Sequence, residues 1–292
     1  MSSLRPRRSC LYMPGANAKA LDKARGLPAD TLIFDLEDAV APEAKADARA
    51  AIVATMAAGG YGKREIIIRA NALSTPWGHD DVKAAATAKP DGVLFPKVDS
   101  AADIEAADKA LRDAGAPDAT AIWVMIETPK SILNIAEIAR AAERTRLTTF
   151  VMGTNDLAKD MHAAQTPDRS AFLAALSMTV IAGRAYGITL IDGVFNDIQD
   201  SGGFEAICRQ GLELGFDGKT LIHPSQIGAC NAIFAPTPEE VARSRSVIAA
   251  FADPSNAGKG VLKVDGKMTE LLHLEQAKRT VAVADAIEGM GA

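Results

Sequence analysis

Short apolar runs alternate along the chain with longer Ala-rich segments in which apolar residues recur every three or four positions. The short runs are typical of strands buried on both faces, and the longer segments are typical of helices that cover a sheet. Eight such runs are present, at residues 9–13, 31–36, 65–69, 92–96, 121–126, 148–152, 189–194 and 219–222. The clearest helical segments are residues 103–114, 131–144 and 169–186.

Eight strand–helix repeats favour an α/β chain closed into a TIM (β/α)8 barrel. An open, doubly wound parallel sheet is the alternative. The turn after the first run, Pro14-Gly15-Ala16-Asn17, lacks the GxGxxG pattern that nucleotide-binding members of that class carry there. The pattern therefore predicts a barrel.

The strand–helix alternation ends near Pro224. Two helical segments, residues 226–234 and 239–251, are followed by a Pro-, Asn- and Gly-containing loop, a short hairpin at 261–268 and a last helix at 272–287. This tail is too short for an independent domain. We expect residues 1–235 to form the catalytic barrel and residues 236–292 to form a lid or oligomerisation extension.

Polar side chains follow almost every predicted strand. In a TIM barrel the carboxyl ends of all strands meet at one face, where active sites lie. Glu127 and Asp156 follow neighbouring strands, and two carboxylates with room for water suit Mg²⁺. The sequence therefore predicts Glu127 and Asp156 as metal ligands.

Other strand ends carry Glu37, Asp38, Arg69 and Asn71. A carboxylate after a strand is commonly a helix cap or an ion-pair partner, but convergence of so many on one face favours a site. Arg69 is predicted to bind a carboxylate or a thioester carbonyl through its planar fork. A structural pairing of Arg69 with the acidic residues 35–38 is the alternative, and both roles are compatible.

Composition narrows the function further. The 292 residues are 48% hydrophobic and carry a net charge of −5, which gives no electrostatic reason to expect nucleic acid or an anionic membrane as a partner. No apolar run approaches the roughly 20 residues that span a bilayer. Three cysteines without CxxC spacing are typical of buried thiols in a reducing cytoplasm.

Seven segments together resemble the citrate lyase beta-subunit-like family, within the HpcH/HpaI aldolase superfamily. They are residues 11–17, 34–40, 69–71, 96–98, 126–129, 153–157 and 215–224, and they occur in order with matching spacing. The resemblance implies a TIM barrel, Mg²⁺ (with Mn²⁺ as a substitute) on Glu127 and Asp156, and a substrate carboxylate on Arg69. It also implies coenzyme A thioesters and 2-oxo acids as small-molecule partners, and a homotrimer or dimer of trimers.

The same resemblance directs attention to the tail. The family's lyases carry Met-Ile-Asp in the lid, where the Asp is a catalytic acid/base, and this chain has Met268-Thr269-Glu270. Glu270, Glu37 and Asp38 are therefore candidate proton-transfer groups and Arg69 a catalytic partner. Asn71 and Glu127 are expected beside the substrate, and Asn17 and Lys19 are candidate coenzyme A phosphate contacts.

The main hypothesis from the sequence is a magnesium-dependent lyase that cleaves a carbon–carbon bond in malyl-CoA or citramalyl-CoA. The alternative is a (3S)-malyl-CoA thioesterase that uses the same site. Glu270, one methylene longer than the lid Asp of the lyases, is compatible with both, either with a shifted lid or aimed at a water molecule. A pyruvate-type aldolase independent of coenzyme A and a non-catalytic accessory subunit are more remote hypotheses.

Overall fold

The computed structural model describes residues 5–291. They form two compact units, one from Arg7 to Asn231 and one from Ala232 onward with the segment before Arg7. The sequence places a boundary between residues 235 and 236 and assigns catalytic and lid roles to the two parts; those roles stay a prediction.

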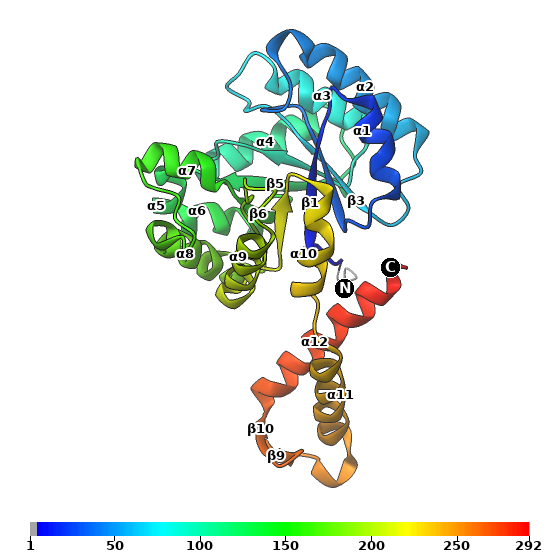
Figure 1. The fold of residues 1–292 in the computed structure, drawn as a ribbon, viewed down its shortest axis with the longest axis vertical. Helices are drawn as coiled ribbons and strands as arrows, with labels where there is room; N and C mark the ends of the chain where they lie inside the picture. Colours follow the sequence, from blue (N-terminus) through cyan, green and yellow to red (C-terminus); the bar gives the residue numbers. More distant parts are fainter. Residues whose placement is uncertain (1–4, 292) are drawn as a thin grey trace. The chain divides into compact units, whose positions relative to one another are not determined.

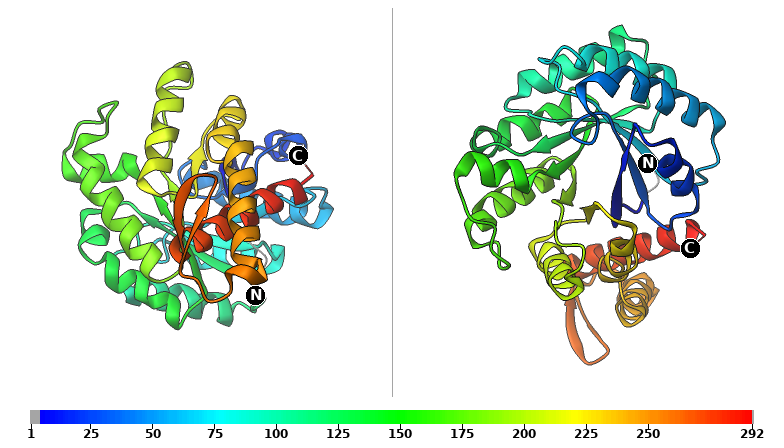
Figure 2. Two further views of the ribbon diagram at one scale, coloured as in Figure 1. Left: turned by 90° about the horizontal axis from the view of Figure 1, so that it is seen from below. Right: turned by 45° about the horizontal axis from the view of Figure 1, so that its top comes forward.

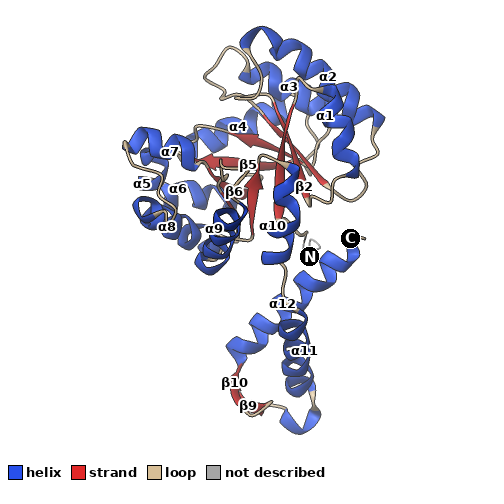
Figure 3. Cartoon of the chain, viewed as in Figure 1, coloured by secondary structure: helices blue, strands red, loops and turns tan. Residues whose placement is uncertain are grey.

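Eight parallel strands close into a barrel, because β1 pairs with β2 on one side and with β8 on the other (Figures 1 and 3). The TIM-barrel prediction is confirmed. The strands are β1 (Ser9–Pro14), β2 (Thr31–Asp35), β3 (Glu65–Arg69), β4 (Gly92–Phe95), β5 (Ala121–Ile126), β6 (Leu147–Met152), β7 (Thr189–Asp192) and β8 (Gly218–Leu221).

Helices cover the outside of these strands (Figure 2, right). They are α1 (Ala18–Lys23), α2 (Lys45–Ala58), α3 (Gly78–Ala88), α4 (Ala101–Asp113), α5 (Pro129–Leu133), α6 (Ile135–Arg140), α7 (Thr154–Met161), α8 (Leu173–Ala185), α9 (Ser201–Leu214) and α10 (Ile227–Ile233).

Two predicted elements differ from the structure for local reasons. The helix expected over residues 131–144 is divided into α5 and α6 at Asn134, whose side-chain amide donates to the Asp99 carbonyl oxygen at 2.9 Å. Strand β7 ends at Asp192 rather than at residue 194, because the Asp192 carboxylate accepts the N–H of Gly193 at 2.8 Å and turns the chain out of the sheet.

The barrel interior is packed with buried apolar side chains from the seven strands β1 to β7. They are Cys10, Ile33, Ile67, Leu94, Trp123, Met125, Val151 and Ile191. Below them, at the amino ends of the strands, the Arg7 guanidinium lies 5.2 Å from the centre of the Trp123 ring and binds both oxygens of Glu65 at 2.6 and 2.7 Å. This end is therefore filled, and the polar chemistry lies at the opposite end.

The second unit contains α11 (Pro238–Ala252), the hairpin strands β9 (Val261–Val264) and β10 (Lys267–Glu270), and α12 (Leu271–Gly289). Its small core contains Val247, Leu262, Val264 and Ala277. The helix–hairpin–helix order predicted for the tail is confirmed. Among residues 5–291, no helix is both long and apolar enough to cross a membrane.

Candidate active site

Three side chains from neighbouring strands meet at the carboxyl end of the barrel. Glu127 follows β5 and is only 2% exposed, and Asp156 lies in the first turn of α7, directly after β6. Lys97 follows β4, and its Nζ lies 2.7 Å from Asp156 Oδ1 and 3.4 Å from Glu127 Oε1. The two carboxylates that the sequence predicts as a pair thus share one cationic group.

The backbone around these residues is shaped to bring them together. Lys97 has a φ of +54°, a conformation that costs a non-glycine residue about 1–3 kcal/mol, and its N–H donates to Glu127 Oε1 at 2.8 Å. Gly153 precedes α7, and a Cβ there would lie 2.4 Å from Glu127 Cβ and 2.6 Å from Glu127 Oε2. Only glycine allows the chain at the start of α7, three residues before Asp156, to lie so close to the buried Glu127.

The titration behaviour of the two carboxyls differs. Burial raises the pKa of Glu127, and the ammonium and N–H of Lys97 only partly oppose it. Burial also acts to raise the pKa of Asp156, but the hydrogen bonds from Lys97 and Lys159 outweigh it, so that the pKa is lowered. Asp156 is the more readily ionised of the pair.

The donor set is compatible with Mg²⁺. Within residues 5–291, no group of three or more His, Cys, Asp or Glu side chains gathers as a metal cluster, so a cation here would have two protein carboxylates and water. Mg²⁺ commonly binds one or two carboxylates and keeps several waters. One ammonium already contacts both carboxylates, which indicates that a single cation reaches both. The assignment of Glu127 and Asp156 as metal ligands stays a prediction.

Arg69, the last residue of β3, is committed to neighbouring carboxylates. Its Nε and Nη2 donate to the two oxygens of Asp35 at 2.7 and 2.6 Å, and Nη1 lies 2.7 Å from Glu37 and 3.2 Å from Asp38. Burial would lower its pKa, but Asp35 raises it well above the ordinary value. The structural pairing considered in the sequence is present, and binding of substrate by Arg69 stays a prediction.

Asp35 fixes the loop that carries the other two acids. Its oxygens accept the N–H groups of Glu37 and Ala39 at 2.8 and 3.1 Å. Glu37 is half-buried, while Asp38 is exposed. Burial, together with nearby Asp38 and against the attraction of Arg69, raises the pKa of Glu37 to about 8. Glu37 therefore gains and loses a proton near neutral pH, as an acid/base group must.

Asn71 lies directly behind this loop. Its side-chain oxygen accepts from Lys45 Nζ at 2.9 Å, and its amide nitrogen donates to the Leu36 carbonyl oxygen and to Asp81 at 2.8 and 2.6 Å. Lys45 Nζ also donates to the Leu36 and Glu37 carbonyl oxygens at 2.6 and 2.8 Å. In this geometry Asn71 supports the acidic loop, and its predicted contact with substrate stays a prediction.

The remaining predicted residues lie on surface elements. Asn17 caps α1 by accepting the Ala20 N–H at 3.1 Å, and Lys19 is exposed on the same helix. Glu270, in the second unit, caps α12, and its N–H donates to His273 Nδ1 at 2.9 Å. Their roles toward coenzyme A and in proton transfer stay predictions.

Two residues at this end of the barrel received no role from the sequence. Lys97 is one, although its position after β4 is the same signal that marked Glu127 and Asp156. Tyr12, on β1, is the other: the Arg69 guanidinium lies 4.7 Å from the centre of its ring, and its hydroxyl donates to Met125 Sδ at 3.6 Å. A tyrosine in an apolar strand looks like core, so the sequence pattern did not distinguish it.

The fold and the site define a TIM barrel with a carboxylate-rich site at the carboxyl ends of its strands. The chain belongs to the HpcH/HpaI aldolase/citrate lyase family, whose model matches residues 8–224.

The chain is 48% identical over 282 residues to a (3S)-malyl-CoA thioesterase of Cereibacter sphaeroides, which covers 97% of this chain and 96% of the relative. It is 34% identical to the citrate lyase subunit beta of Leuconostoc mesenteroides, over 98% and 96% of the two chains. The solved structure of CitE from Mycobacterium tuberculosis, in complex with magnesium, acetoacetate and coenzyme A, is similar with a TM-score of 0.76 and 28% identity. That match covers 95% of this chain and 97% of the other.

The raised pKa of Glu37 predicts a pH-dependent stability. Below its ordinary pKa of 4.5 the carboxyl is protonated in both folded and unfolded chains; between 4.5 and about 8 only the folded chain holds the proton. Stability is therefore lost as pH rises through this window. Glu37→Gln should match wild type at pH 4.5 and melt higher at pH 8.5, by at least roughly 2–4 °C. The exposed Glu43→Gln is the control, and parallel melting curves for Glu37→Gln and wild type would contradict the assignment.

Replacement of Arg69 by lysine should remove the fork while keeping the charge. We expect Arg69→Lys to lower the free energy of unfolding by roughly 1.5–3 kcal/mol and to lower kcat/KM as well. Arg184→Lys is the matched control, because Arg184 makes the same two-bond contact with Asp217 (2.9 and 2.8 Å) away from the site. A loss of stability in urea without any loss of kcat/KM would make Arg69 a structural residue only.

Proposed function

We propose that this protein is a magnesium-dependent (3S)-malyl-CoA thioesterase. Water adds to the thioester carbonyl carbon, the carbon–sulfur bond breaks, and malate and free coenzyme A form, with a proton passing from the water to the thiolate. The observation that supports this most strongly is 48% identity to a thioesterase of that name over nearly the full length of both chains. The similarity favours hydrolysis, the alternative in the sequence analysis, over carbon–carbon cleavage.

The carbon–carbon lyase remains a second candidate, because the citrate lyase beta subunit is also similar over nearly its whole length. Both reactions need a polarised carbonyl and a group that moves a proton, so one barrel site suits both. The two reactions differ in the bond that breaks. In hydrolysis, water attacks the thioester carbonyl carbon and the carbon–sulfur bond breaks; in the lyase reaction, the carbon–carbon bond between the two fragments breaks.

When bound, Mg²⁺ (or Mn²⁺ in its place) polarises substrate oxygens as a Lewis acid. The chain's own residues have separate tasks. Glu127 and Asp156 would hold the metal, and Arg69, through its contacts with Asp35, Glu37 and Asp38, keeps the acidic loop in place. Glu37, whose pKa burial and the nearby Asp38 raise to about 8 against the attraction of Arg69, exchanges a proton with the reacting water.

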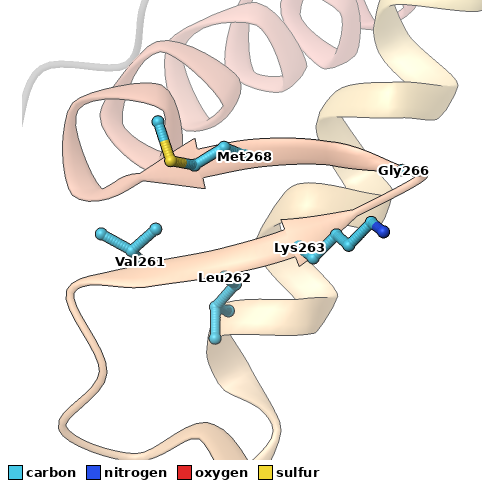
Figure 4. Close-up of a pocket in the computed structure, with 5 residues that line it drawn as sticks. All are labelled: Val261, Leu262, Lys263, Gly266 and Met268. Atoms are coloured by element: carbon cyan, nitrogen blue, oxygen red, sulfur yellow. The ribbon is translucent and has the colours of Figure 1, made fainter.

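We also propose an assembly of the trimer type, a homotrimer or a dimer of trimers, in which the second unit serves a neighbouring subunit as a lid. The hairpin supports this. Val261, Leu262, Lys263, Gly266 and Met268 line a shallow groove on it (Figure 4). Val261, Met268, Leu271 and Leu272 are each at least half exposed, which is unusual for large apolar side chains on so small a unit.

Product analysis tests the proposed reaction. Purified protein given (3S)-malyl-CoA and Mg²⁺ should release malate and free coenzyme A, measured by chromatography and by a thiol reagent. EDTA should stop the release and added Mg²⁺ should restore it. Glyoxylate and acetyl-CoA as products would instead establish the lyase, and no turnover by either route would contradict both.

The lid is tested with a pair of variants on the second unit. Glu270→Ala should lower kcat about 10²–10⁴-fold, the contribution of a positioned acid or base. Glu275→Ala, which removes an exposed α12 carboxylate that pairs with Lys278, should leave kcat unchanged. If the lid acts on a neighbour, mixed Glu270→Ala and Glu127→Ala subunits should regain part of the activity. Equal rates for Glu270→Ala and Glu275→Ala would exclude Glu270 from catalysis.

A further inference from the structure

Lys97 has an unusual position among the cations of the barrel mouth. Its backbone N–H and its side-chain nitrogen both contact the same oxygen, Glu127 Oε1, at 2.8 and 3.4 Å. The side-chain nitrogen also contacts Asp156 Oδ1 at 2.7 Å. The left-handed backbone at φ +54° makes this double contact, and the Lys97 side chain is still 39% exposed.

We propose that Lys97 is an exchangeable cation: it neutralises Glu127 and Asp156 until a divalent cation takes that place, and its ammonium then binds the free carboxylate of the substrate. This inference rests on the proposed function, because it assigns a recognition residue to the acidic end of a dicarboxylate monothioester. The proposal adds Lys97 to the residues that bind the substrate carboxylate, and it makes Lys97 a competitor of the divalent cation.

Competition follows from the contacts. A cation held by both Glu127 and Asp156 must lie within bonding distance of an oxygen of each, and the Lys97 ammonium already fills that position. Both occupants are positive, so neither tolerates the other at the same oxygens. The exposed Lys159 differs, because it contacts Asp156 Oδ1 at 3.2 Å but has no contact with Glu127.

The contacts of Arg69 indicate why Lys97, and not Arg69, would bind the substrate carboxylate. Arg69 is buried, with its Nε and Nη2 on Asp35 and its Nη1 between Glu37 and Asp38. Transfer of this fork to a substrate would leave buried Asp35 without its partner, which is costly. Lys97 is exposed on a flexible four-carbon chain, and a divalent cation releases it from both carboxylates. It is therefore the cation that is free to bind an added carboxylate.

The charges at the carboxyl end of the barrel also favour Lys97 as the group that binds the substrate carboxylate. Five carboxylates at this end of the barrel are paired with three cations, Arg69, Lys97 and the exposed Lys159; the carboxylates are Asp35, Glu37, Asp38, Glu127 and Asp156. An anionic substrate is repelled by such a surface unless a metal balances part of it and a mobile cation reaches the incoming carboxylate. Lys97 meets the second requirement with no change in the buried Arg69 network.

The test is calorimetry on the full-length protein without turnover. Mg²⁺ alone is titrated into wild type, Lys97→Met, Lys97→Arg and Lys159→Met. Lys97→Met should bind Mg²⁺ about tenfold more tightly, since no ammonium has to leave the two carboxylates. Lys97→Arg keeps a competing cation and should stay close to wild type. Lys159→Met, the same change on a residue that contacts Asp156 and Asp160 instead of Asp156 and Glu127, should shift affinity by much less.

The second titration uses malate as the probe at saturating Mg²⁺. Lys97→Met should now bind the probe about tenfold more weakly, and Lys97→Arg should recover most of the affinity. Lys97→Met is thus expected to raise the affinity for Mg²⁺ and to lower the affinity for malate. Mg²⁺ affinity in Lys97→Met that is unchanged or weaker, or malate affinity that is unchanged, would overturn the proposal. Since neither titration requires malyl-CoA or its cleavage, failure of the proposed reaction would be seen separately.

Discussion

The ion pair between Asp35 and Arg69 is the interaction on which the barrel mouth depends. The two residues are register partners at the ends of β2 and β3, and both are buried. Removal of one partner of such a pair typically costs 3–5 kcal/mol, because a buried charge is left uncompensated. The same Asp35 accepts two N–H groups of the following loop, so the pair also fixes where Glu37 and Asp38 lie.

Elsewhere in the barrel unit, several buried carboxylates have cations in close contact. Glu65 is bound by Arg7, Asp30 by Arg8, and Asp192 by both Arg169 and Lys219. At the mouth this balance is incomplete. Burial raises the pKa of both Glu37 and Glu127 despite the nearby Arg69 and Lys97. Such perturbed carboxyls are characteristic of functional sites, since a structural ion pair is better served by full compensation.

The sequence predicted the barrel because the spacing of apolar runs depends only on the length and burial of each strand. It also placed Glu127 and Asp156 after neighbouring strands, and β5 and β6 do pair. It did not foresee Lys97 between them: the position after β4 marks the residue, but the left-handed backbone that brings its N–H onto Glu127 has no local signal in the sequence. In the same way, the contacts of Asn71 with Lys45 and Asp81 depend on packing between β3 and helices α2 and α3.

Hydrolysis and carbon–carbon cleavage in such a site differ in the position of the proton-transfer group more than in the metal or the barrel. Glu270 begins a helix, with its N–H on His273 Nδ1 and its carboxylate at the helix N-terminus, where a negative charge is stabilised. Its backbone is thus anchored, and its extra methylene relative to aspartate displaces only the carboxylate. A carboxylate moved outward by one bond from a fixed backbone suits a water molecule between the acid and the thioester, whereas direct contact with a substrate hydroxyl suits the shorter side chain. On the proposal that Glu270 moves the proton, this one-bond difference would separate a thioesterase from a lyase on one barrel, with the groups that hold the substrate unchanged.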